Sequence, residues 1–336
     1  MKTGYAFSTR LSGVGSAFPA RRLSNDELSK TVETSNEWIL ERTGIRERRI
    51  SDPTNEDECN SSLGFAASKR ALEMAGKSAD EIDLIIYATC TPDTLIPSTA
   101  CFLQKKLGAS KAAAFDVNAA CSGFIFGLSV ADQFIRTGQA KTILVVGADV
   151  LSTFTNWQDR TSCILFGDGA GAAILERTEA NASQRILSTH IGSDGTLWDL
   201  FHLPAGGSKM ETTPEVLAQN LHKMQMKGKE IFKSAVRTLA DYAAKAIESN
   251  QINLSQVDWL VPHQANLRII EAVAKRLNFP MEKVLVNIDR YGNTSSATVP
   301  SAFDEAVRDG RIKKGQIILF DVFGAGLTYG SVLLRW

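Results

Sequence analysis

The sequence predicts an α/β fold built from two duplicated halves, and three observations lead to this prediction. Apolar strand-like runs alternate with amphipathic helix-like stretches, an order typical of parallel or mixed sheets that helices cover. The chain also repeats itself, because segment 81–87 resembles segment 256–262 and, at nearly the same offset, segment 114–117 has a counterpart at 285–289. Finally, 336 residues with 44% hydrophobic content are enough for two domain-sized cores.

Each half is expected to contain a helix, a strand, a second helix and two further strands, in that order. In the first half these elements are predicted at 63–75, 81–87, 98–107, 114–117 and 142–147. In the second half they are predicted at 232–249, 256–262, 265–277, 285–289 and 316–320. The polar segment 177–185 is the expected join, which gives an N-terminal half of residues 1–180 and a C-terminal half of residues 181–336. Both halves should form one body, because no Gly/Ser-rich or Pro-rich linker separates them.

Composition excludes several classes of function. Lys plus Arg equals Asp plus Glu at 37 each, so no global field would attract nucleic acid or an anionic membrane. No apolar run approaches the roughly 18 residues of a membrane span, and the N-terminal 19 residues lack the apolar core of a signal peptide. The five cysteines and four histidines show no CxxC or HxxxH spacing, so no metal site is expected. We expect a cytoplasmic protein with reduced thiols.

Three polar residues follow strands of this duplicated fold. Cys121 comes after the second strand of the first half, at the start of a helix, where the helix N-terminus favours thiolate over thiol. His263 follows the first strand of the second half, and Asn293 follows the counterpart of the strand before Cys121. Taken singly, each has a structural interpretation: a buried thiol for Cys121, a hydrogen-bonded core histidine, which is favoured for an isolated His263, and a turn residue for Asn293. Ligands bind at the carboxyl ends of strands in open α/β sheets, so together they predict a Cys–His–Asn site.

Motifs distributed along the chain resemble the β-ketoacyl-acyl carrier protein synthase III family of thiolase-like condensing enzymes. The resemblance runs in order from about Leu11 to the C-terminus and implies a duplicated five-layer αβαβα fold. The residues that carry it are Thr34-Ser35-Asn36-Glu37-Trp38-Ile39, Arg42-Thr43-Gly44-Ile45-Arg46, Ala120-Cys121-Ser122-Gly123, Phe166-Gly167-Asp168-Gly169-Ala170-Gly171, His263-Gln264-Ala265-Asn266, Gly292-Asn293-Thr294-Ser295 and Gly324-Ala325-Gly326-Leu327-Thr328-Tyr329-Gly330.

The resemblance implies an acyltransferase that starts fatty acid biosynthesis by decarboxylative condensation of an acyl-CoA primer with malonyl-acyl carrier protein. Cys121 would carry the acyl group. His263 and Asn293 would donate hydrogen bonds to the malonyl thioester oxygen, where the enolate charge develops. For this role His263 should be neutral, with its proton on the nitrogen that faces the substrate. The backbone N–H groups of Cys121 and Ala325 would form a second oxyanion hole, although the family often has a third glycine at the position of Ala325.

The resemblance also implies substrate contacts and partners, with acyl-CoA as a substrate and no cofactor. The coenzyme A contacts would come from Thr34, Trp38, Arg42 and Arg160; a family asparagine on the pantetheine arm aligns with Lys229, and that contact is not carried over. The acyl pocket would be lined by Leu151, Phe166, Phe201 and Met224, with Ile96 entering from the partner subunit of a homodimer. Acidic acyl carrier protein would dock on Lys233, Arg268, Lys275 and Arg276, in a salt-dependent way.

Other interpretations compete with this one. The glycine-rich segment 167–171 resembles a dinucleotide fingerprint, but residues 172–175 read as a strand rather than a helix, so tight packing at a turn is expected instead. A Cys–His–Asn hydrolase, in which Asn orients His, is the nearest chemical alternative. A catalytically silent acyl-CoA-binding scaffold is an alternative from another class. A related condensing enzyme of secondary metabolism, which uses a different acyl thioester, is the closest competitor, and the primer could be acetyl, branched or longer.

Overall fold

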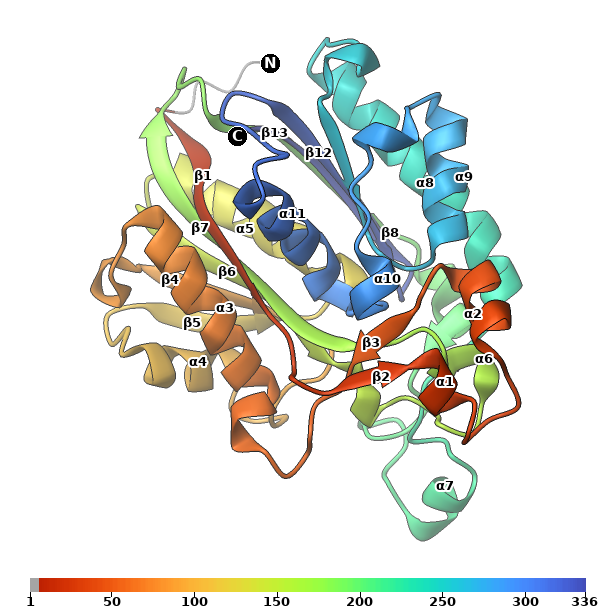
Figure 1. The fold of residues 1–336 in the computed structure, drawn as a ribbon. Helices are drawn as coiled ribbons and strands as arrows, with labels where there is room; N and C mark the ends of the chain where they lie inside the picture. The colour runs from red at the N-terminus through yellow and green to blue at the C-terminus, as the bar shows by residue number, and fades with distance from the viewer. Residues whose placement is uncertain (1–5) are drawn as a thin grey trace.

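Two β-sheets form the framework of the molecule, whose computed structural model describes residues 6–336 (Figure 1). The strand order of the first sheet is β1-β7-β6-β4-β5, with bounds Phe7–Ala17, Asp168–Glu179, Thr142–Val150, Leu84–Ala88 and Ala113–Val117. The order of the second sheet is β11-β12-β13-β8, with bounds Trp259–Pro262, Ile317–Gly324, Thr328–Arg335 and Arg185–Ser193. Strand β4 runs parallel to β5 and β6, and β11 runs parallel to β12, whereas the other pairs are antiparallel.

Helices separate and cover the two sheets. Helices α5 (Gly123–Arg136) and α11 (Thr298–Arg308) lie between the sheets and share one buried core with strands of both (Figure 1). The outer face of the first sheet packs against α3 (Asn60–Ala75) and α4 (Thr99–Leu107). The outer face of the second sheet packs against α8 (Gly228–Ser249) and α9 (Leu267–Leu277). The αβαβα arrangement of five layers, predicted from the family resemblance, is therefore confirmed.

Shorter elements cluster near one end of the two sheets (Figure 1). They are β2 (Arg22–Ser24), α1 (Asn25–Leu28), α2 (Asn36–Thr43), β3 (Glu47–Arg49), α6 (Arg160–Cys163), β9 (Phe201–His202), α7 (Pro214–Ala218), β10 (Gln225–Met226) and α10 (Ile288–Tyr291). Among the helices in residues 6–336, none is both long and apolar enough to pass through a bilayer.

Most of the predicted elements are present, but the strand predicted at 285–289 is wrong. The chain makes a single parallel bridge there, between Val284 and Leu260, and the Leu285 N–H donates to the Leu260 carbonyl at 2.9 Å. The Asn287 N–H donates instead to the Gln264 side chain at 3.0 Å, and α10 then begins. One ladder bond does not make a strand, so the backbone leaves the sheet edge before the second half can repeat β5.

The join between the halves is shorter than predicted. Strand β7 continues to Glu179 and β8 begins at Arg185, so the strands extend into both ends of the polar segment 177–185. Antiparallel pairing of β7 with β1 continues to Glu179, which explains why polar residues at its end are still in a strand. The boundary between residues 180 and 181 stays a prediction.

Candidate active site

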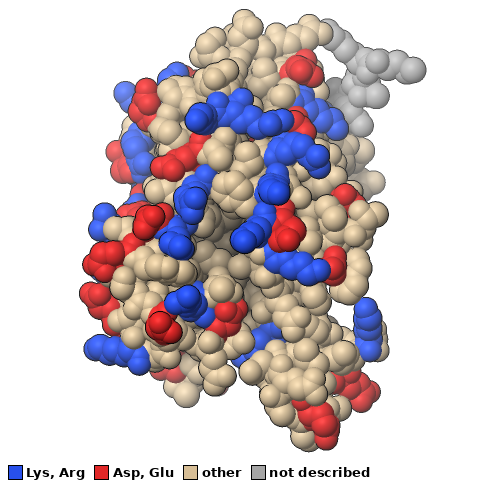
Figure 2. Space-filling model, turned by 90° about the vertical axis from the view of Figure 1, so that its right-hand side faces the viewer, with Lys and Arg blue, Asp and Glu red and all other residues tan. Residues whose placement is uncertain are grey.

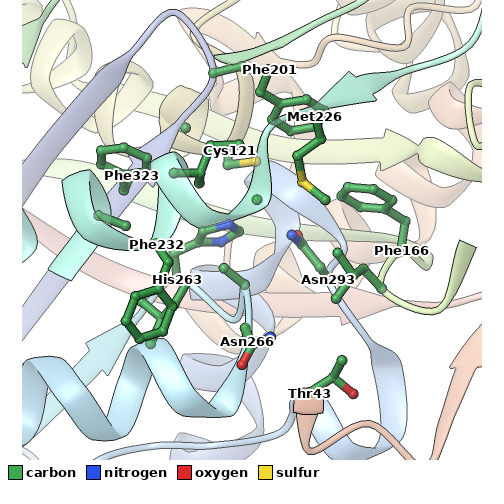
Figure 3. Close-up of a pocket in the computed structure, with 18 of the residues that line it drawn as sticks. Thr43, Cys121, Phe166, Phe201, Met226, Phe232, His263, Asn266, Asn293 and Phe323 are labelled. Carbon is green, nitrogen blue, oxygen red and sulfur yellow. The ribbon is translucent and has the colours of Figure 1, made fainter. Parts of the chain in front are cut away.

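A pocket of about 380 Å³ brings the three predicted catalytic residues together (Figure 3). Cys121, His263 and Asn293 all line it, and they come from three separate loops of the two halves. In Figure 3 the His263 ring and the Asn293 amide lie side by side, with the Cys121 sulfur nearby. The juxtaposition expected from the strand ends is therefore present, and the chemical roles follow from the contacts of each side chain.

Cys121 lies in a tight turn between β5 and α5. It occupies the middle of a one-turn 3₁₀ helix, Ala120–Ser122, and Ala120 before it has a left-handed φ of 46°, which is unusual for a residue with a Cβ atom. The end of β12 packs directly on this turn, because a Cβ atom on Gly324 would lie 2.8 Å from the Cys121 nitrogen. Only glycine permits that approach, so the C-terminal turn and the Cys121 backbone form one unit.

Burial determines the protonation state of the Cys121 thiol. The side chain is 6% exposed, and burial raises the pKa of the Cys121 thiol to about 12, although the Ser295 hydroxyl, which lies 3.5 Å from its sulfur, lowers it in part. The helix N-terminus is expected to favour the thiolate, whereas desolvation of the charged form acts in the opposite direction. Burial therefore favours the thiol form of Cys121 in the free protein.

His263 is held at the end of β11 as a neutral imidazole. Its backbone N–H donates to the Asp321 carbonyl at 2.8 Å, which continues the parallel pairing of β11 with β12 by one residue. Burial lowers the pKa of the His263 imidazole to about 3. Its Nδ1 atom is 2.7 Å from the Thr298 hydroxyl. The neutral state required for a hydrogen-bond donor to an enolate is thus favoured by burial.

Asn293 is fixed at both its backbone and its side chain. Its N–H donates to the Leu165 carbonyl at 2.9 Å, and its carbonyl accepts the Gly167 N–H at 3.0 Å. Its side-chain Oδ1 accepts the Ser295 N–H at 2.9 Å. Because the amide oxygen is used in this way, the donor group Nδ2 is the atom left for the pocket.

Asp149 ties the loop after Asn293 to the first half of the chain. One oxygen of this fully buried carboxylate accepts the N–H of Cys90 at 2.8 Å. The other accepts the hydroxyl of Ser296 at 2.9 Å and its N–H at 3.2 Å. Ser296 follows Ser295, whose hydroxyl contacts the Cys121 sulfur, so the carboxylate holds the two halves in register beside the nucleophile.

The glycine-rich segment 167–171 serves close packing, as expected, but it does so within a strand rather than at a turn. Strand β7 begins at Asp168. A Cβ atom on Gly167 would lie 2.3 Å from the Tyr291 carbonyl, and one on Gly171 would lie 2.6 Å from the Pro300 ring. The glycines thus allow α11 and the loop before it to approach β7, which leaves the dinucleotide interpretation without support.

An aromatic and cationic cluster contributes to the lining of the pocket. Trp38 and Arg42 line it, and the Arg42 guanidinium carbon is 4.4 Å from the Trp38 ring centroid. The Arg160 guanidinium is 5.1 Å from the same centroid and also donates to the Glu33 carbonyl at 3.0 Å. The Thr34 hydroxyl, nearby in sequence, is buried without a hydrogen-bond partner in residues 6–336. A purine stacking on this indole would have to replace one of the two guanidinium groups.

Four of the five predicted acyl-pocket residues lie together. Leu151, Phe166 and Met224 form a buried cluster, and Phe201 stacks on Phe166 with ring centroids 5.9 Å apart. Phe166 and Phe201 line the pocket itself. Ile96 is elsewhere, with 90% of its side chain exposed, so it does not contribute to the pocket of its own chain.

The four predicted docking residues lie on α8 and α9. Lys233 is on α8, whereas Arg268, Lys275 and Arg276 are on α9. Lys and Arg side chains gather on the face that carries these helices, around a hollow (Figure 2). Arg276 is only 3.8 Å from Asp241 of α8, so part of its charge is already paired.

Sequence reasoning missed two hydroxyl groups that touch the catalytic residues. Ser295 contacts the Cys121 sulfur, and Thr298 contacts the His263 ring. Both follow Asn293 within five residues, but no periodicity signals contacts that span 174 and 35 residues of sequence. The one sequence signal for these two residues is that they follow the strand predicted at 285–289.

Two protein-family models match the chain, and both describe one family. Residues 115–195 match 3-oxoacyl-acyl-carrier-protein (ACP) synthase III, and residues 247–336 match the C-terminal part of the same family. The chain is 51% identical over 332 residues to β-ketoacyl-acyl-carrier-protein synthase III of Xanthomonas campestris pv. campestris, with 98% of each chain covered. It is 52% identical over 328 residues to the protein of the same name from Methylococcus capsulatus, with 98% of this chain and 99% of the relative covered.

Solved structures of similar proteins have the same fold. The crystal structure of 3-oxoacyl-acyl-carrier-protein synthase III from Aquifex aeolicus has a TM-score of 0.90 at 44% identity and covers 98% of this chain and 100% of its own. The priming β-ketosynthase of the R1128 polyketide biosynthetic pathway has a TM-score of 0.90 at 36% identity, with 100% and 98% coverage. Both alignments include the segments that carry Cys121, His263 and Asn293, because they span nearly the whole chain.

Proposed function

The chain belongs to the 3-oxoacyl-acyl-carrier-protein synthase III family, and we propose that Cys121, His263 and Asn293 carry out its condensation reaction. It is a condensing acyltransferase with a thiolase-like fold, and its reaction initiates fatty acid biosynthesis. The substrates proposed from the names of its relatives are an acyl-CoA primer and malonyl-acyl carrier protein. The observation that carries the assignment is the shared pocket of these three side chains, which Trp38 and Arg42 also line.

In the first half-reaction the Cys121 sulfur attacks the carbonyl carbon of the acyl-CoA thioester. A carbon–sulfur bond to Cys121 forms, the bond to coenzyme A breaks, and the thiol proton leaves with the coenzyme A sulfur. The N–H groups of Cys121 and Ala325 stabilise the oxyanion. Ala325 suits this role despite its Cβ atom, because the left-handed residue of the turn is Gly326, with φ 129°, while Ala325 keeps a negative φ.

In the second half-reaction malonyl-acyl carrier protein loses its carboxylate as carbon dioxide. The electron pair of the broken carbon–carbon bond moves toward the thioester oxygen, which accepts hydrogen bonds from His263 and the Nδ2 of Asn293. The enolate carbon then attacks the acyl-Cys121 carbonyl, a carbon–carbon bond forms as the bond to sulfur breaks, and the Cys121 thiolate that leaves takes up a proton from solvent. A neutral imidazole and an amide suit a developing negative charge, since neither adds a charge of its own to the buried site.

A hydrolase receives less support from the hydrogen bonds of the site. In a Cys–His–Asn hydrolase the asparagine orients the histidine. Here the His263 Nδ1 contacts Thr298, and the Asn293 Oδ1 accepts from the Ser295 backbone. Both residues are thus positioned separately, as two independent donors require.

One experiment separates the candidate functions. The protein is mixed with acyl-CoA, and the Cys121 peptide is analysed by mass spectrometry for an acyl adduct. Malonyl-acyl carrier protein is then added, and we expect the adduct to disappear as carbon dioxide and a β-ketoacyl product form. A persistent adduct without carbon dioxide would refute the synthase assignment. Release of free acid would indicate the hydrolase, and failure to form an adduct would indicate a silent scaffold.

The identity of the primer is left to experiment, and we propose that the protein acts in the cytoplasm. Repeating the first step with acetyl, branched and longer acyl-CoA compounds identifies the primer and tests the alternative of a specialised pathway, such as that of the R1128 relative. All five cysteines are free thiols, which suits a reducing compartment, so we place the reaction in the cytoplasm.

The molecule is proposed to act as a homodimer whose acyl pocket is completed across the interface. Leu95 and Ile96, in the loop between β4 and α4, are 82% and 90% exposed. Two adjacent apolar residues with such high solvent exposure are typical of a surface that another protein covers. Ile96 of the partner subunit would meet the cluster of Leu151, Phe166 and Met224 and limit its depth.

Replacing this side chain should alter both assembly and primer choice. We expect Ile96→Asp to weaken the dimer, because it places a charge in an apolar interface, and Ile96→Ala to favour primers that are longer by one or two methylenes, each worth about 1–3 kcal/mol. Analytical ultracentrifugation and acylation rates over a primer series measure the two effects. Leu217→Ala, another exposed apolar residue, is the control. Unchanged primer preference in the Ile96→Ala variant would contradict the proposed entry into the pocket.

The basic face of α8 and α9 is proposed to bind acyl carrier protein. Reversing the charge with Arg268→Glu and Lys275→Glu should raise KM for malonyl-acyl carrier protein by about fivefold or less per residue, since exposed ion pairs contribute about 0.2–1 kcal/mol. The kcat value should stay close to that of the wild type, and the difference should shrink as salt is added. Steady-state kinetics at several ionic strengths measure this. Lys111→Glu, an exposed change on the first half, should have no such effect.

A further inference from the structure

The hydroxyl of Thr298 contacts the Nδ1 atom of His263, the histidine proposed to act in the condensation reaction. Thr298 is the first residue of α11, and its Oγ1 lies 2.7 Å from the Nδ1 of His263. Both residues are buried, with exposed fractions of 1% and 4%. This hydroxyl is the hydrogen-bonding partner of the His263 ring within the part of the chain that the structure describes. The direction of this one hydrogen bond therefore determines which ring nitrogen carries the proton.

The Thr298 hydroxyl has one proton and two groups that can accept it. One is the Nδ1 of His263, and the other is the Ser295 carbonyl, 2.9 Å from the hydroxyl oxygen. That carbonyl already accepts the backbone N–H of Thr298 at the end of the short 3₁₀ turn Ser295–Ala297. The Ser295 carbonyl is thus hydrogen-bonded even when the Thr298 hydroxyl does not donate to it. Rotation of the O–H toward His263 therefore leaves no buried group unpaired.

The distance also suits a hydroxyl donor. The separation of 2.7 Å between Oγ1 and Nδ1 lies within the normal hydrogen-bond range. A neutral imidazole has one N–H and one lone pair, and a buried lone pair without a donor is costly. A Thr298 O–H that donates to Nδ1 satisfies this lone pair and leaves the proton on Nε2, the nitrogen on the pocket side.

We propose that Thr298 is a positioning residue that holds the proton of His263 on Nε2. The inference rests on the proposed function, because it concerns which step of that reaction the histidine serves. With its proton on Nε2, His263 donates to the thioester oxygen during decarboxylation, and its lone pair on Nδ1 faces Thr298 rather than Cys121. Thr298 should therefore matter for the malonyl half-reaction and much less for acylation of Cys121.

The tautomer can be read directly in the wild-type protein. We expect the nitrogen NMR spectrum of protein labelled at its histidines to show a protonated Nε2 and an unprotonated Nδ1 for His263. The three other histidines, at 190, 202 and 222, are told apart by removing them one at a time. A protonated Nδ1 in the free protein would overturn the proposal, whatever the activity of the enzyme.

Two substitutions test the kinetic consequence. Thr298→Val keeps the shape of the side chain but removes the hydroxyl, and we expect it to slow decarboxylation of malonyl-acyl carrier protein by about 10- to 100-fold. Acylation of Cys121 by acyl-CoA should change by less than about threefold, because the loss is confined to one step. Thr298→Ser retains the hydroxyl and should restore most of the decarboxylation rate. A merely structural role would slow both steps together.

The outcomes distinguish this inference from the proposed function. If the wild-type protein forms no acyl-Cys121 or releases no carbon dioxide, the proposed function fails, while the NMR spectrum still reports the tautomer. If the wild-type protein does both, and Thr298→Val either leaves decarboxylation unchanged or slows acylation equally, the inference fails. Should the valine variant not fold, as judged by thermal unfolding, Thr298→Ala provides the same comparison of the two steps.

Discussion

Replacement of Cys121 by alanine is expected to abolish condensation. We predict a loss of at least about 10⁴-fold in product formation and no acyl adduct on the protein, because no other group in the pocket can form the thioester. The fold should be retained, since alanine removes one sulfur atom from a buried turn. Mass spectrometry after incubation with acyl-CoA, together with product assays, measures the loss.

A matched control is available in the same chain. Cys163 is also fully buried but does not line the pocket, so Cys163→Ala should keep both the adduct and the product. An adduct that persists in Cys121→Ala would mean that the acyl group is carried elsewhere.

The pH dependence gives a second check, because a thiol of pKa about 12 has a thiolate fraction that rises about tenfold per pH unit below that value. Alkylation of Cys121 in the free protein should rise accordingly from pH 7 to pH 9.

Activation of the nucleophile therefore depends on the substrate. Burial favours the protonated form of Cys121, and in the tautomer proposed for His263 the ring lone pair on Nδ1 faces Thr298 rather than the thiol. The proton then passes to the departing coenzyme A sulfur as the new thioester forms. Such an exchange limits the reaction of Cys121 with adventitious electrophiles at neutral pH, since burial keeps the thiolate fraction of the free protein small.

The proximity of the proposed catalytic triad could be predicted from the sequence because Cys121 and His263 follow strands, and Asn293 follows a segment that still makes a single bridge to the sheet edge. Chain duplication gave Cys121 and Asn293 equivalent positions, and the carboxyl ends of β5 and β11 meet at one pocket. A pattern of apolar residues is enough to place such ends within a few positions. This explains why the layers and the position of the triad could be predicted without coordinates.

Other features depend on contacts that a pattern does not contain. The run at 285–289 is apolar enough for a strand. However, the Asn287 N–H donates to the Gln264 side chain and not to the backbone of a neighbouring strand. The protonation of Cys121 depends on how deeply the turn is buried, and an apolar pattern does not reveal that depth. The Thr298 contact arises because α11 is packed between the sheets, a property of the assembled layers.

Replacement of Asn293 by aspartate is expected to lower decarboxylation by about 10²- to 10³-fold, the effect of losing one donor to a developing oxyanion. The change is nearly isosteric, and one carboxylate oxygen can still accept the Ser295 N–H. The other oxygen would face the enolate and repel its charge. Release of carbon dioxide from malonyl-acyl carrier protein measures the effect, and acylation of Cys121 should be far less affected because it involves no enolate.

The same substitution also discriminates between the synthase and the hydrolase. An asparagine that only orients a histidine can be replaced by aspartate, which accepts the same hydrogen bond, so a hydrolase would keep much of its acyl-enzyme turnover. Asn253→Asp, at an exposed helix cap where both residues are good caps, controls for the added charge. Equal losses in acylation and decarboxylation for Asn293→Asp would contradict a role confined to the enolate, because a donor that acts only in one transition state cannot slow the other.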